Sequence, residues 1–413
     1  ALIVAPTSLM HNWFKEAEKF TPELKVLLLQ GPDRHQYFEQ ISHYDIVLTT
    51  YPLLARDEEQ LKQYEYHQLI LDEAQNIKNP RAKAAQIVRQ LKARHRLCLT
   101  GTPMENHLGE LWALFYFLMP GFLYSQEIFN KKYRHPIEKR GDQQLRQKLV
   151  NRIKPFILRR LKTDVAKELP EKTTIEVNID MNDQQSKLYE AVRATMQENI
   201  QKIVAEKGFK RSQIQILDAL LKLRQVCCHP SLLKLDSVKI GQANSAKLEQ
   251  LMDMVVPMVE EGRKILIFSQ FTSMLELIEQ QLHHAEIGYV KLTGKTKKRD
   301  EVITAFQSGQ VPVFLISLKA GGVGLNLTAA DTVIHYDPWW NPAAEDQASD
   351  RAWRIGQDKP VFVYKLITNK SIEEKILALQ QNKAELAQSI LSTDHEGEAK
   401  LTENDVMNLF EKF

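Results

Sequence analysis

The sequence predicts an α/β protein with two lobes, each built on a parallel sheet, joined by a mainly helical region. Three observations predict this class. Short apolar runs of strand length alternate with helical patterns in both halves of the chain. That alternation is replaced between about residues 120 and 240 by long, charged helical periodicity. Several apolar runs also end abruptly in acidic or glycine-rich residues, as strands do at the carboxyl edge of a parallel sheet.

Composition limits the function classes. The chain has 413 residues, which is enough for two or three domains, and its 43% hydrophobic and 26% charged content is typical of a globular protein without membrane spans. A net charge of +3 means that any basic surface for a polyanion has to be local. Three cysteines imply no disulfide framework and favour a reducing compartment.

The first lobe is expected over residues 1–119. Its apolar run Leu2–Ala5 is followed by Pro6-Thr7-Ser8, which is typical of a helix start, and the helix is expected to end near Phe20. Further elements follow in alternation. Strands are expected at Lys25–Leu29, Asp45–Leu48, Leu69–Leu71 and Arg96–Leu99, and helices at Ala82–Lys92 and Gly109–Leu118.

Residues 120–240 are expected to form a helical insertion and linker, residues 241–391 the second lobe, and residues 392–413 a tail. The helical periodicity is clearest over Asp183–Lys207 and Gln213–Cys227. Strands are expected at Lys264–Phe268, Tyr289–Leu292, Val313–Ser317, Thr332–Tyr336 and Val361–Leu366, and helices at Thr272–His283, Arg299–Phe306 and Ser371–Leu391.

Two adjacent carboxylates, Asp72 and Glu73, follow the apolar run Leu69–Leu71. Acids at the end of a central strand suit Mg²⁺, which prefers oxygen ligands and usually arrives with a nucleotide's phosphates. In this interpretation Asp72 holds the metal through water, and Glu73 polarises the attacking water. The alternative is an ordinary helix N-terminus, where acids are also common.

The second lobe carries two further patterns. The glycine-rich turn Ala320–Asn326 follows the strand Val313–Ser317 and permits close approach of the backbone to a phosphate or ribose. Arg351 and Arg354 are three residues apart, so a helix would place both on one face, where two guanidinium groups can hold a γ-phosphate. A plain tight turn and a surface arginine pair are the structural alternatives.

Several motifs together resemble those of the Swi/Snf-type ATPases, which are helicase-like enzymes of superfamily two. The motifs lie in both lobes and in the region between them. They are Asp72-Glu73-Ala74-Gln75, Leu99–Pro103, Leu158–Lys162, Cys228-His229-Pro230, Asp337–Pro342 and Arg354–Gln357.

The resemblance implies two RecA-like lobes that use ATP and Mg²⁺ and bind double-stranded DNA. It implies that Asp72 and Glu73 are Walker B-type acids, with Asp72 binding Mg²⁺ through water, and that Gln75 couples nucleotide state to the lobe interface. The other implied site residues fall into two groups. Nucleotide-site residues are Thr100, Gly101, Thr102, Gly322, Gly324, Gln347, Arg351 and Arg354, and DNA-facing residues are Thr7, Ser8, Thr50, Tyr51, Gln270, Phe271, Lys319 and Trp340.

The family's phosphate-binding loop, which ends in Gly-Lys-Thr, is expected upstream of Ala1, so we expect this chain alone to be inactive. Gly294-Lys295-Thr296 is no substitute, because such a loop has a glycine five positions before its last glycine, where this chain has Tyr289. These residues are expected instead to form a basic strip near the DNA backbone. Cys227-Cys228-His229 lacks the second ligand pair of a structural zinc site, and core packing is expected.

The resemblance therefore predicts an ATP-driven translocase on double-stranded DNA. The expected protein is a monomer without membrane contact, with a DNA-bound protein complex as its cargo, located in the bacterial cytoplasm at the nucleoid or in a eukaryotic nucleus. Two alternatives remain open at this point. One is a DNA-binding scaffold without enzymatic activity, suggested by the missing loop, and the other is a strand-separating helicase.

Overall fold

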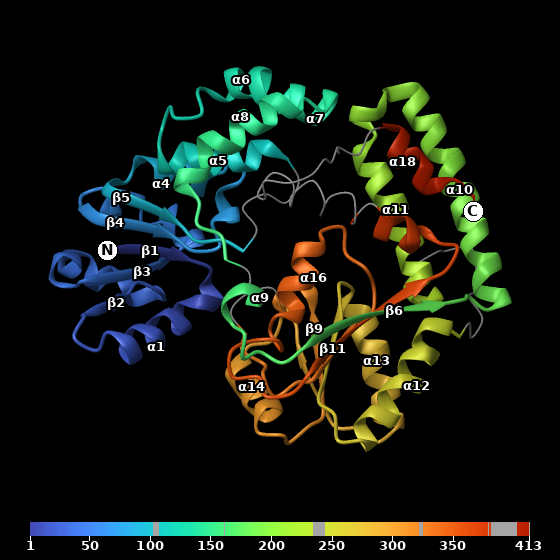
Figure 1. Cartoon of the computed structure of the whole chain (residues 1–413). Helices are drawn as coiled ribbons and strands as arrows, with labels where there is room; N and C mark the ends of the chain where they lie inside the picture. Colours follow the sequence, from blue (N-terminus) through green and yellow to red (C-terminus); the bar gives the residue numbers. More distant parts are fainter. Residues whose placement is uncertain are drawn as a thin grey trace. The chain divides into compact units, whose positions relative to one another are not determined.

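A computed structural model describes residues 1–101, 107–160, 162–233, 244–321, 325–378, 380 and 403–412. The chain divides into two compact units (Figure 1). The first unit includes Ala1–Leu158, and the second includes Arg159–Ala384 and Leu401–Phe413. Within the described ranges, no helix combines the length and apolar character that a membrane span requires.

The first unit is built on a five-stranded parallel sheet with the strand order β2-β3-β1-β4-β5. The strands alternate with helices along the chain, as the sequence predicts. The strands are β1 (Leu2–Ala5), β2 (Val26–Leu28), β3 (Ile46–Thr50), β4 (Glu65–Leu71) and β5 (Lys92–Cys98). The central strand β1 is fully buried, which explains its uninterrupted apolar sequence.

The helices of the first unit cover this sheet and extend beyond it. The first helix, α1, packs on β2 and β3, whereas α5 packs on β5 (Figure 1). The helices that follow α5 in the chain pack with α5 in a separate apolar cluster. The helices are α1 (Met10–Phe20), α2 (Tyr51–Leu54), α3 (Glu58–Leu61), α4 (Lys83–Gln90), α5 (Leu108–Leu118), α6 (Gln126–Phe129), α7 (His135–Arg140) and α8 (Gln143–Ile153).

The second unit is built on a six-stranded parallel sheet with the order β6-β11-β10-β7-β9-β8. Its strands are β6 (Lys172–Ile179), β7 (Ile265–Ser269), β8 (Tyr289–Leu292), β9 (Val313–Ser317), β10 (Thr332–His335) and β11 (Val361–Thr368). Neighbouring residues of β7 enter different apolar clusters, with Ile265 in one and Leu266 in the other. Both faces of this sheet are therefore covered, as in doubly wound α/β folds.

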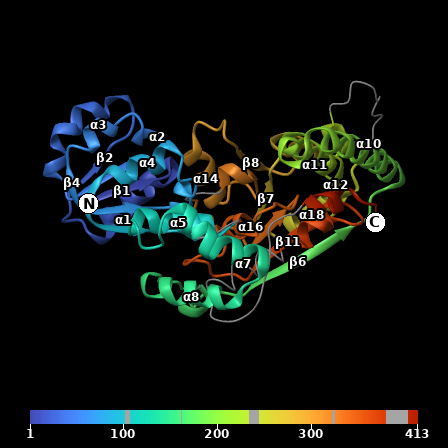
Figure 2. The ribbon, with the colours of Figure 1, turned by 90° about the horizontal axis from the view of Figure 1, so that it is seen from above.

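Helices pack on both faces of this sheet, and a separate helical group contains α10, α11 and α18 (Figure 2). Asn182 caps α10 by accepting a hydrogen bond from the Gln185 amide at 2.8 Å. The helices are α9 (Lys162–Val165), α10 (Asp183–Lys207), α11 (Gln213–Cys228), α12 (Ala246–Glu260), α13 (Thr272–His284), α14 (Arg299–Gln307), α15 (Leu318–Gly321), α16 (Pro342–Ser349) and α18 (Glu403–Phe410).

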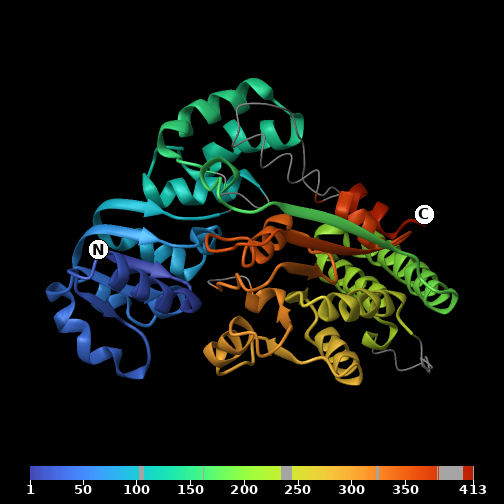
Figure 3. The ribbon, with the colours of Figure 1, turned by 60° about the horizontal axis from the view of Figure 1, so that its bottom comes forward.

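The α/β class and the two parallel sheets are confirmed, but two local predictions need correction. Sequence reasoning missed β6, the long edge strand drawn in green in Figure 3, which lies within the mainly helical region. Its apolar residues alternate with polar ones because successive side chains of a strand point to opposite faces of the sheet, and one face of β6 is exposed. In addition, Thr7 and Ser8 do not cap α1, since a short 3₁₀ turn (Thr7–Leu9) precedes that helix and Leu9 occupies the cap position.

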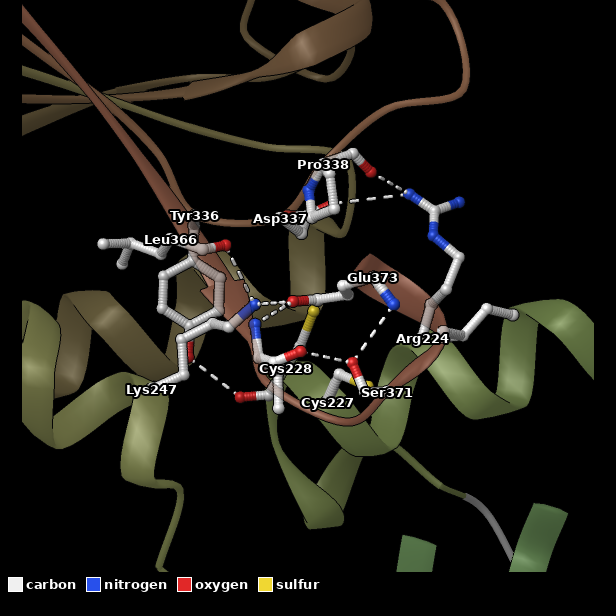
Figure 4. A network of polar contacts seen from close by, with 12 residues as sticks. Arg224, Cys227, Cys228, Lys247, Tyr336, Asp337, Pro338, Leu366, Ser371 and Glu373 are labelled. Carbon is white, nitrogen blue, oxygen red and sulfur yellow. Dashed lines mark hydrogen bonds and ion pairs between the residues drawn. The ribbon is translucent and has the colours of Figure 1, made fainter. Parts of the chain in front are cut away.

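A buried ion pair joins α12 to the segment after β11. The ammonium group of Lys247 contacts the carboxylate of Glu373, and the two side chains are 1% and 0% exposed (Figure 4). Lys247 also donates to the carbonyl of Leu366 at 3.2 Å, and Glu373 accepts from the amide of Thr368 at 2.8 Å. Burial lowers the pKa of Lys247, but the charge of Glu373, the nearby Cys228 and Cys227 and the hydrogen bond to Glu373 together outweigh it, so the net pKa is raised and the lysine stays charged.

Replacing Lys247 by methionine is expected to lower the free energy of unfolding by about 3–5 kcal/mol, because the carboxylate of Glu373 would remain buried without its counter-charge. The thermal midpoint Tm, followed by circular dichroism, measures this loss. The double variant Lys247→Met/Glu373→Gln removes both charges and should recover most of the stability. A single variant as stable as wild type would contradict the assigned role of the pair.

Candidate functional site

The acidic pair of the first unit lies at the carboxyl edge of its sheet, where β4 ends. The amide of Asp72 still donates to the carbonyl of Val4 in β1 at 2.9 Å, and the amide of Ala74 donates to the carbonyl of Leu99 at 3.0 Å. These bonds fix the backbone on both sides of Glu73. The two acids therefore occupy the sheet edge at which open α/β folds bind their ligands.

Three neighbours hold Asp72. Its two carboxylate oxygens accept from the indole Nε1 of Trp13 at 2.8 Å and from the amide of Glu73 at 2.9 Å. The hydroxyl of Tyr51 donates to the carbonyl of Asp72 at 2.8 Å. Burial raises the pKa of Tyr51, and so do the nearby Cys98 and acidic groups, which keeps the hydroxyl protonated as a donor. Asp72 therefore has a fixed orientation.

Glu73 has an unusual backbone conformation. Its φ of 48° and ψ of 54° lie in the left-handed region, which costs a residue other than glycine about 1–3 kcal/mol. Backbone strain persists only where the surrounding structure enforces it, and it is most common at functional sites. Here the backbone bonds of Asp72 and Ala74 enforce it.

A hydrogen-bond chain orients the Glu73 side chain. The amide Nε2 of Gln75 donates to Glu73 Oε2 at 2.6 Å, and the hydroxyl of Thr100 donates to Gln75 Oε1 at 2.7 Å. Three residues that the sequence predicted separately are thereby brought into one relay. A change at Thr100 can reach the carboxylate of Glu73 through the Gln75 amide group.

The donor set at this edge fits Mg²⁺ that arrives with phosphates. Each oxygen of Asp72 accepts a hydrogen bond from the protein, and a carboxylate has about four lone-pair sites, so the oxygens can also accept from a metal-bound water. No group of three or more metal-ligating side chains occurs among the described residues. The arrangement therefore suits a metal ligated mainly by nucleotide and water rather than one held entirely by protein.

The other predicted residues of the first unit differ in exposure. Thr7 and Gly101 are exposed, whereas Thr50 and Tyr51 are buried, and Tyr51 bonds to the backbone of Asp72. The side chain of Ser8 and the whole of Thr102 lie outside the described residues. Sequence reasoning missed Trp13, because its contact with Asp72 joins residues 59 positions apart.

The second unit has a basic pocket of about 530 Å³ at the carboxyl ends of β7, β8 and β9. Four cationic side chains contribute to it, with one acid, Glu276. The lining residues are Gln270, Thr272, Glu276, Lys291, Thr293, Gly294, Lys295, Arg299, Ser317, Lys319 and Ala320. The structure thus brings the predicted Gln270 and Lys319 together and adds Gly294 and Lys295, for which the sequence predicted a basic strip.

Two predicted DNA-facing aromatic residues lie deeper in the second unit. Phe271 is only 9% exposed and packs in the apolar core under α13. Trp339 and Trp340 are both half-buried, and they pack against different apolar clusters. Each of the two rings therefore covers an apolar cluster of its own.

The arginine segment also differs from the prediction. The helix α16 ends at Ser349, so Arg351 and Arg354 do not share a helical face. Arg351 is 7% exposed, and its carbonyl accepts from the amide of Leu327 at 3.0 Å. Arg354 donates through Nη1 to the carbonyl of Leu325 at 3.3 Å. Arg354 therefore contacts the last part of the glycine-rich turn, and Arg351 contacts the residue that follows it; Gly322 and Gly324 of this turn lie outside the described residues.

Tertiary bonds explain why the helix ends there. The buried amide of Gln357 donates to the carbonyls of Thr328, Ala330 and Ala352, at 3.1, 2.8 and 3.0 Å. Gly356 has a φ of +100°, which favours glycine and turns the chain between Arg354 and Gln357. These contacts fix a compact loop that continued helix could not form.

The same loop is anchored to the start of the second unit. The indole of Trp353 donates to the carbonyl of Pro170 at 2.7 Å, and its ring contacts the ammonium groups of Lys162 and Lys172. Both lysines also pair with Asp350, at 2.8 and 3.2 Å. Lys162 belongs to the motif Leu158–Lys162, for which the sequence suggested no role. Its contacts with Trp353 and Asp350 hold the segment that contains Arg351 and Arg354. Gln347, in α16, is half-buried.

Two protein families match this chain. Residues 1–232 match the family described as SNF2-related domain, and residues 246–356 match the helicase conserved C-terminal domain. The solved SWI2/SNF2 ATPase core of Sulfolobus solfataricus in complex with dsDNA is 39% identical, with 95% of this chain and 82% of that chain covered and a TM-score of 0.45.

Curated relatives come from bacteria and eukaryotes. YwqA of Bacillus subtilis is 40% identical over 403 residues, covering 95% of this chain and 43% of that protein. The ISWI chromatin-remodeling complex ATPase ISW1 of Saccharomyces cerevisiae is 34% identical over 410 residues, covering 94% and 36%. The chain thus spans less than half the length of these relatives. The match of the first family over more than half of the chain shows that this protein belongs to the SNF2-related family of helicase-like proteins.

Proposed function

We propose that this chain is the motor of a DNA-dependent ATPase that translocates on double-stranded DNA. The observation that carries the proposal is the oriented acidic pair at the edge of the first sheet, where Thr100, Gln75 and Glu73 form one hydrogen-bond relay. Glu73 has a strained backbone, and its neighbours orient its carboxylate. A carboxylate held in this way can polarise the attacking water in phosphoryl transfer.

Each acid has a distinct role in this proposal. Mg²⁺ bound with ATP would offset the charge on the phosphates, and Asp72 would hold it through water. Glu73 accepts a proton or hydrogen bond from the attacking water through a carboxylate that the hydrogen bond from Gln75 orients. Gln75 and Thr100 keep this carboxylate in place and report the state of the site to the segment after β5.

The arginines of the second unit supply positive charge for the same reaction. A guanidinium group presents a planar fork that matches a phosphate and stabilises charge that develops on it. Arg354 is the stronger candidate for direct contact, because it is partly exposed whereas Arg351 is buried. Arg351 and Gln347 are proposed to shape the site beside it.

The basic pocket of the second unit is proposed to bind the DNA backbone. Lys291, Lys295, Arg299 and Lys319 line it, and such clustered cations on a protein of small net charge indicate a local polyanion site. Backbone contacts carry no sequence information, so binding should be independent of sequence and strongly dependent on salt. That property is what movement along DNA requires.

Replacing Lys319 or Lys295 by alanine is expected to weaken binding to a 30-base-pair duplex and to reduce the slope of log K against log salt by about one, because each lysine neutralises about one phosphate. Fluorescence anisotropy at several salt concentrations measures both quantities. Lys202→Ala is the matched control, since Lys202 lies in α10 away from the pocket residues and is 66% exposed. An unchanged slope in both pocket variants would contradict the assignment.

The proposal extends to the activity of this chain alone, its oligomeric state, its location and its cargo. The sequence contains no Gly-x-x-x-x-Gly-Lys-Ser/Thr motif, so we propose that this 413-residue chain alone turns over ATP slowly at most. We further propose that the protein acts as a monomer, in the cytoplasm at a bacterial nucleoid or in a nucleus. Its proposed cargo is a protein complex on DNA; the relative ISW1 is named as the ATPase of a chromatin-remodeling complex.

A further inference from the structure

A buried arginine lies beneath two loops at the carboxyl edge of the second sheet. Arg224 belongs to α11, outside that sheet, and is 3% exposed. Its Nη2 donates to the carbonyl of Pro338 at 2.6 Å and lies 3.8 Å from Oδ2 of Asp337 (Figure 4). One side chain therefore contacts the loop after β10 through both a hydrogen bond and a charge.

Asp337 connects this arginine to the second loop, which follows β7. Its Oδ1 accepts from the hydroxyl of Ser269 at 2.5 Å and from the amide of Gln270 at 3.3 Å. Burial raises the pKa of Asp337, and the charge of Arg224 and the hydrogen bond from Ser269 offset this rise only in part. Through these bonds Asp337 ties the start of the β7 loop to the start of the β10 loop.

Aromatic rings from both loops surround the same guanidinium group. Its central carbon lies 5.9 Å from the centroid of Phe271 and 5.5 Å from the centroids of Trp339 and Trp340. These distances are within the range of cation–π attraction, which is stronger for desolvated groups such as this one. A guanidinium stacks on rings and donates a fork at the same time, which an ammonium group cannot do.

These contacts distinguish Arg224 from an ordinary core residue. Arg224, directly or through Asp337, contacts residues 269–271 and 337–340, the two loops that contain Gln270 and Trp340. Gln270 also lines the basic pocket, and its Nε2 has no hydrogen-bond partner among the described residues although it is buried. An amide group held in this way beside a cationic pocket is available to an incoming acceptor such as a phosphate oxygen.

We infer that Arg224 is a positioning residue that holds the loops 269–271 and 337–340 in the conformation that binds the DNA backbone. This inference rests on the proposed function of the basic pocket. It assigns a role to the end of α11, whose Cys228-His229-Pro230 motif the sequence marked without a function. Cys228 itself is buried, and its carbonyl accepts from the hydroxyls of Ser245 and Tyr336, both within the same network.

The test compares Arg224→Lys with wild type in binding to a fluorescently labelled 30-base-pair duplex. The lysine keeps the charge but loses the fork and the stacking, so the affinity should fall roughly tenfold or more. The slope against salt should stay unchanged, because the phosphate-binding cations remain in place. That pattern differs from Lys319→Ala, for which the slope itself should fall.

Arg193→Lys is the matched control. Arg193 is also a buried arginine in the helical group, and it donates to the carbonyl of Phe410 at 2.7 Å, but it contacts neither loop. Its replacement should leave DNA affinity at the wild-type value. A general loss of packing would weaken both variants alike and would contradict a positioning role for Arg224.

A second variant keeps the test informative if Arg224→Lys does not fold. Arg224→Met/Asp337→Asn removes both buried charges, and replacing a buried pair in this way often preserves folding. It should still bind the duplex roughly tenfold more weakly, because the link between the loops is lost. If neither variant folds, the same affinity measurement is made on Ser269→Ala, which removes the hydroxyl bonded to Asp337.

The outcomes separate this inference from the proposed function. Wild-type chain that does not bind duplex DNA would overturn the proposed function. Wild-type chain that binds DNA, together with folded Arg224 variants or Ser269→Ala of equal affinity, would overturn the positioning role and leave the proposed function standing.

Discussion

Replacing Glu73 by glutamine is expected to slow ATP hydrolysis by the full-length gene product about 10²- to 10⁴-fold, the usual contribution of general acid–base catalysis. Glutamine keeps the shape and can still contact Gln75 and the nucleotide, but it cannot accept a proton from the attacking water. Nucleotide binding should therefore remain, and a fluorescent ATP analogue measures it separately from turnover. The loss should appear in kcat.

The control for this variant is Glu16→Gln, the same chemical change on an exposed residue of α1. It should leave turnover at the wild-type value. Unchanged turnover in Glu73→Gln would refute the role of this carboxylate, and loss of nucleotide binding together with turnover would indicate that Glu73 acts mainly in holding the metal and nucleotide.

Replacing Arg354 by alanine is expected to lower kcat by about 10³-fold, at the lower end of the range for arginines that stabilise charge in phosphoryl transfer. The affinity for ATP should change much less, because the charge that the guanidinium offsets develops mainly in the transition state. Steady-state kinetics and direct nucleotide binding together separate the two effects.

Arg94→Ala serves as the control, since Arg94 is 69% exposed on β5 and pairs with Glu65, which is itself exposed. It should behave like wild type. If Arg354→Ala weakened ATP binding but left kcat unchanged, the arginine would act on the ground state only, and the proposed role in the reaction would be wrong.

Strands and long helices of this protein could be predicted well from sequence. The strand Val313–Ser317 and the helix Asp183–Lys207 have the predicted bounds, because buried parallel strands are continuously apolar and long helices show their 3.6-residue period. The acidic pair was predicted for the same reason, since an apolar run that ends in carboxylates marks the edge of a sheet.

Contacts between distant residues could not be predicted in this way. Trp13 bonds to Asp72, and Arg224 bonds to Pro338, across 59 and 114 positions, and no local pattern encodes such pairs. The end of α16 was missed for a related reason. The sequence after Ser349 can form a helix, but bonds from Gln357 and Trp353 to distant carbonyls stabilise a loop instead. Tertiary hydrogen bonds outweigh the weaker local preference.

The central claim is that ATP hydrolysis is coupled to double-stranded DNA, and one measurement tests it most directly. ATP turnover by the full-length gene product is measured without DNA, with linear duplex DNA and with single-stranded DNA of the same length. The account predicts strong stimulation by the duplex and little by the single strand, and slow turnover at most by the 413-residue chain under all three conditions. Turnover by the full-length product that ignores duplex DNA would contradict the account.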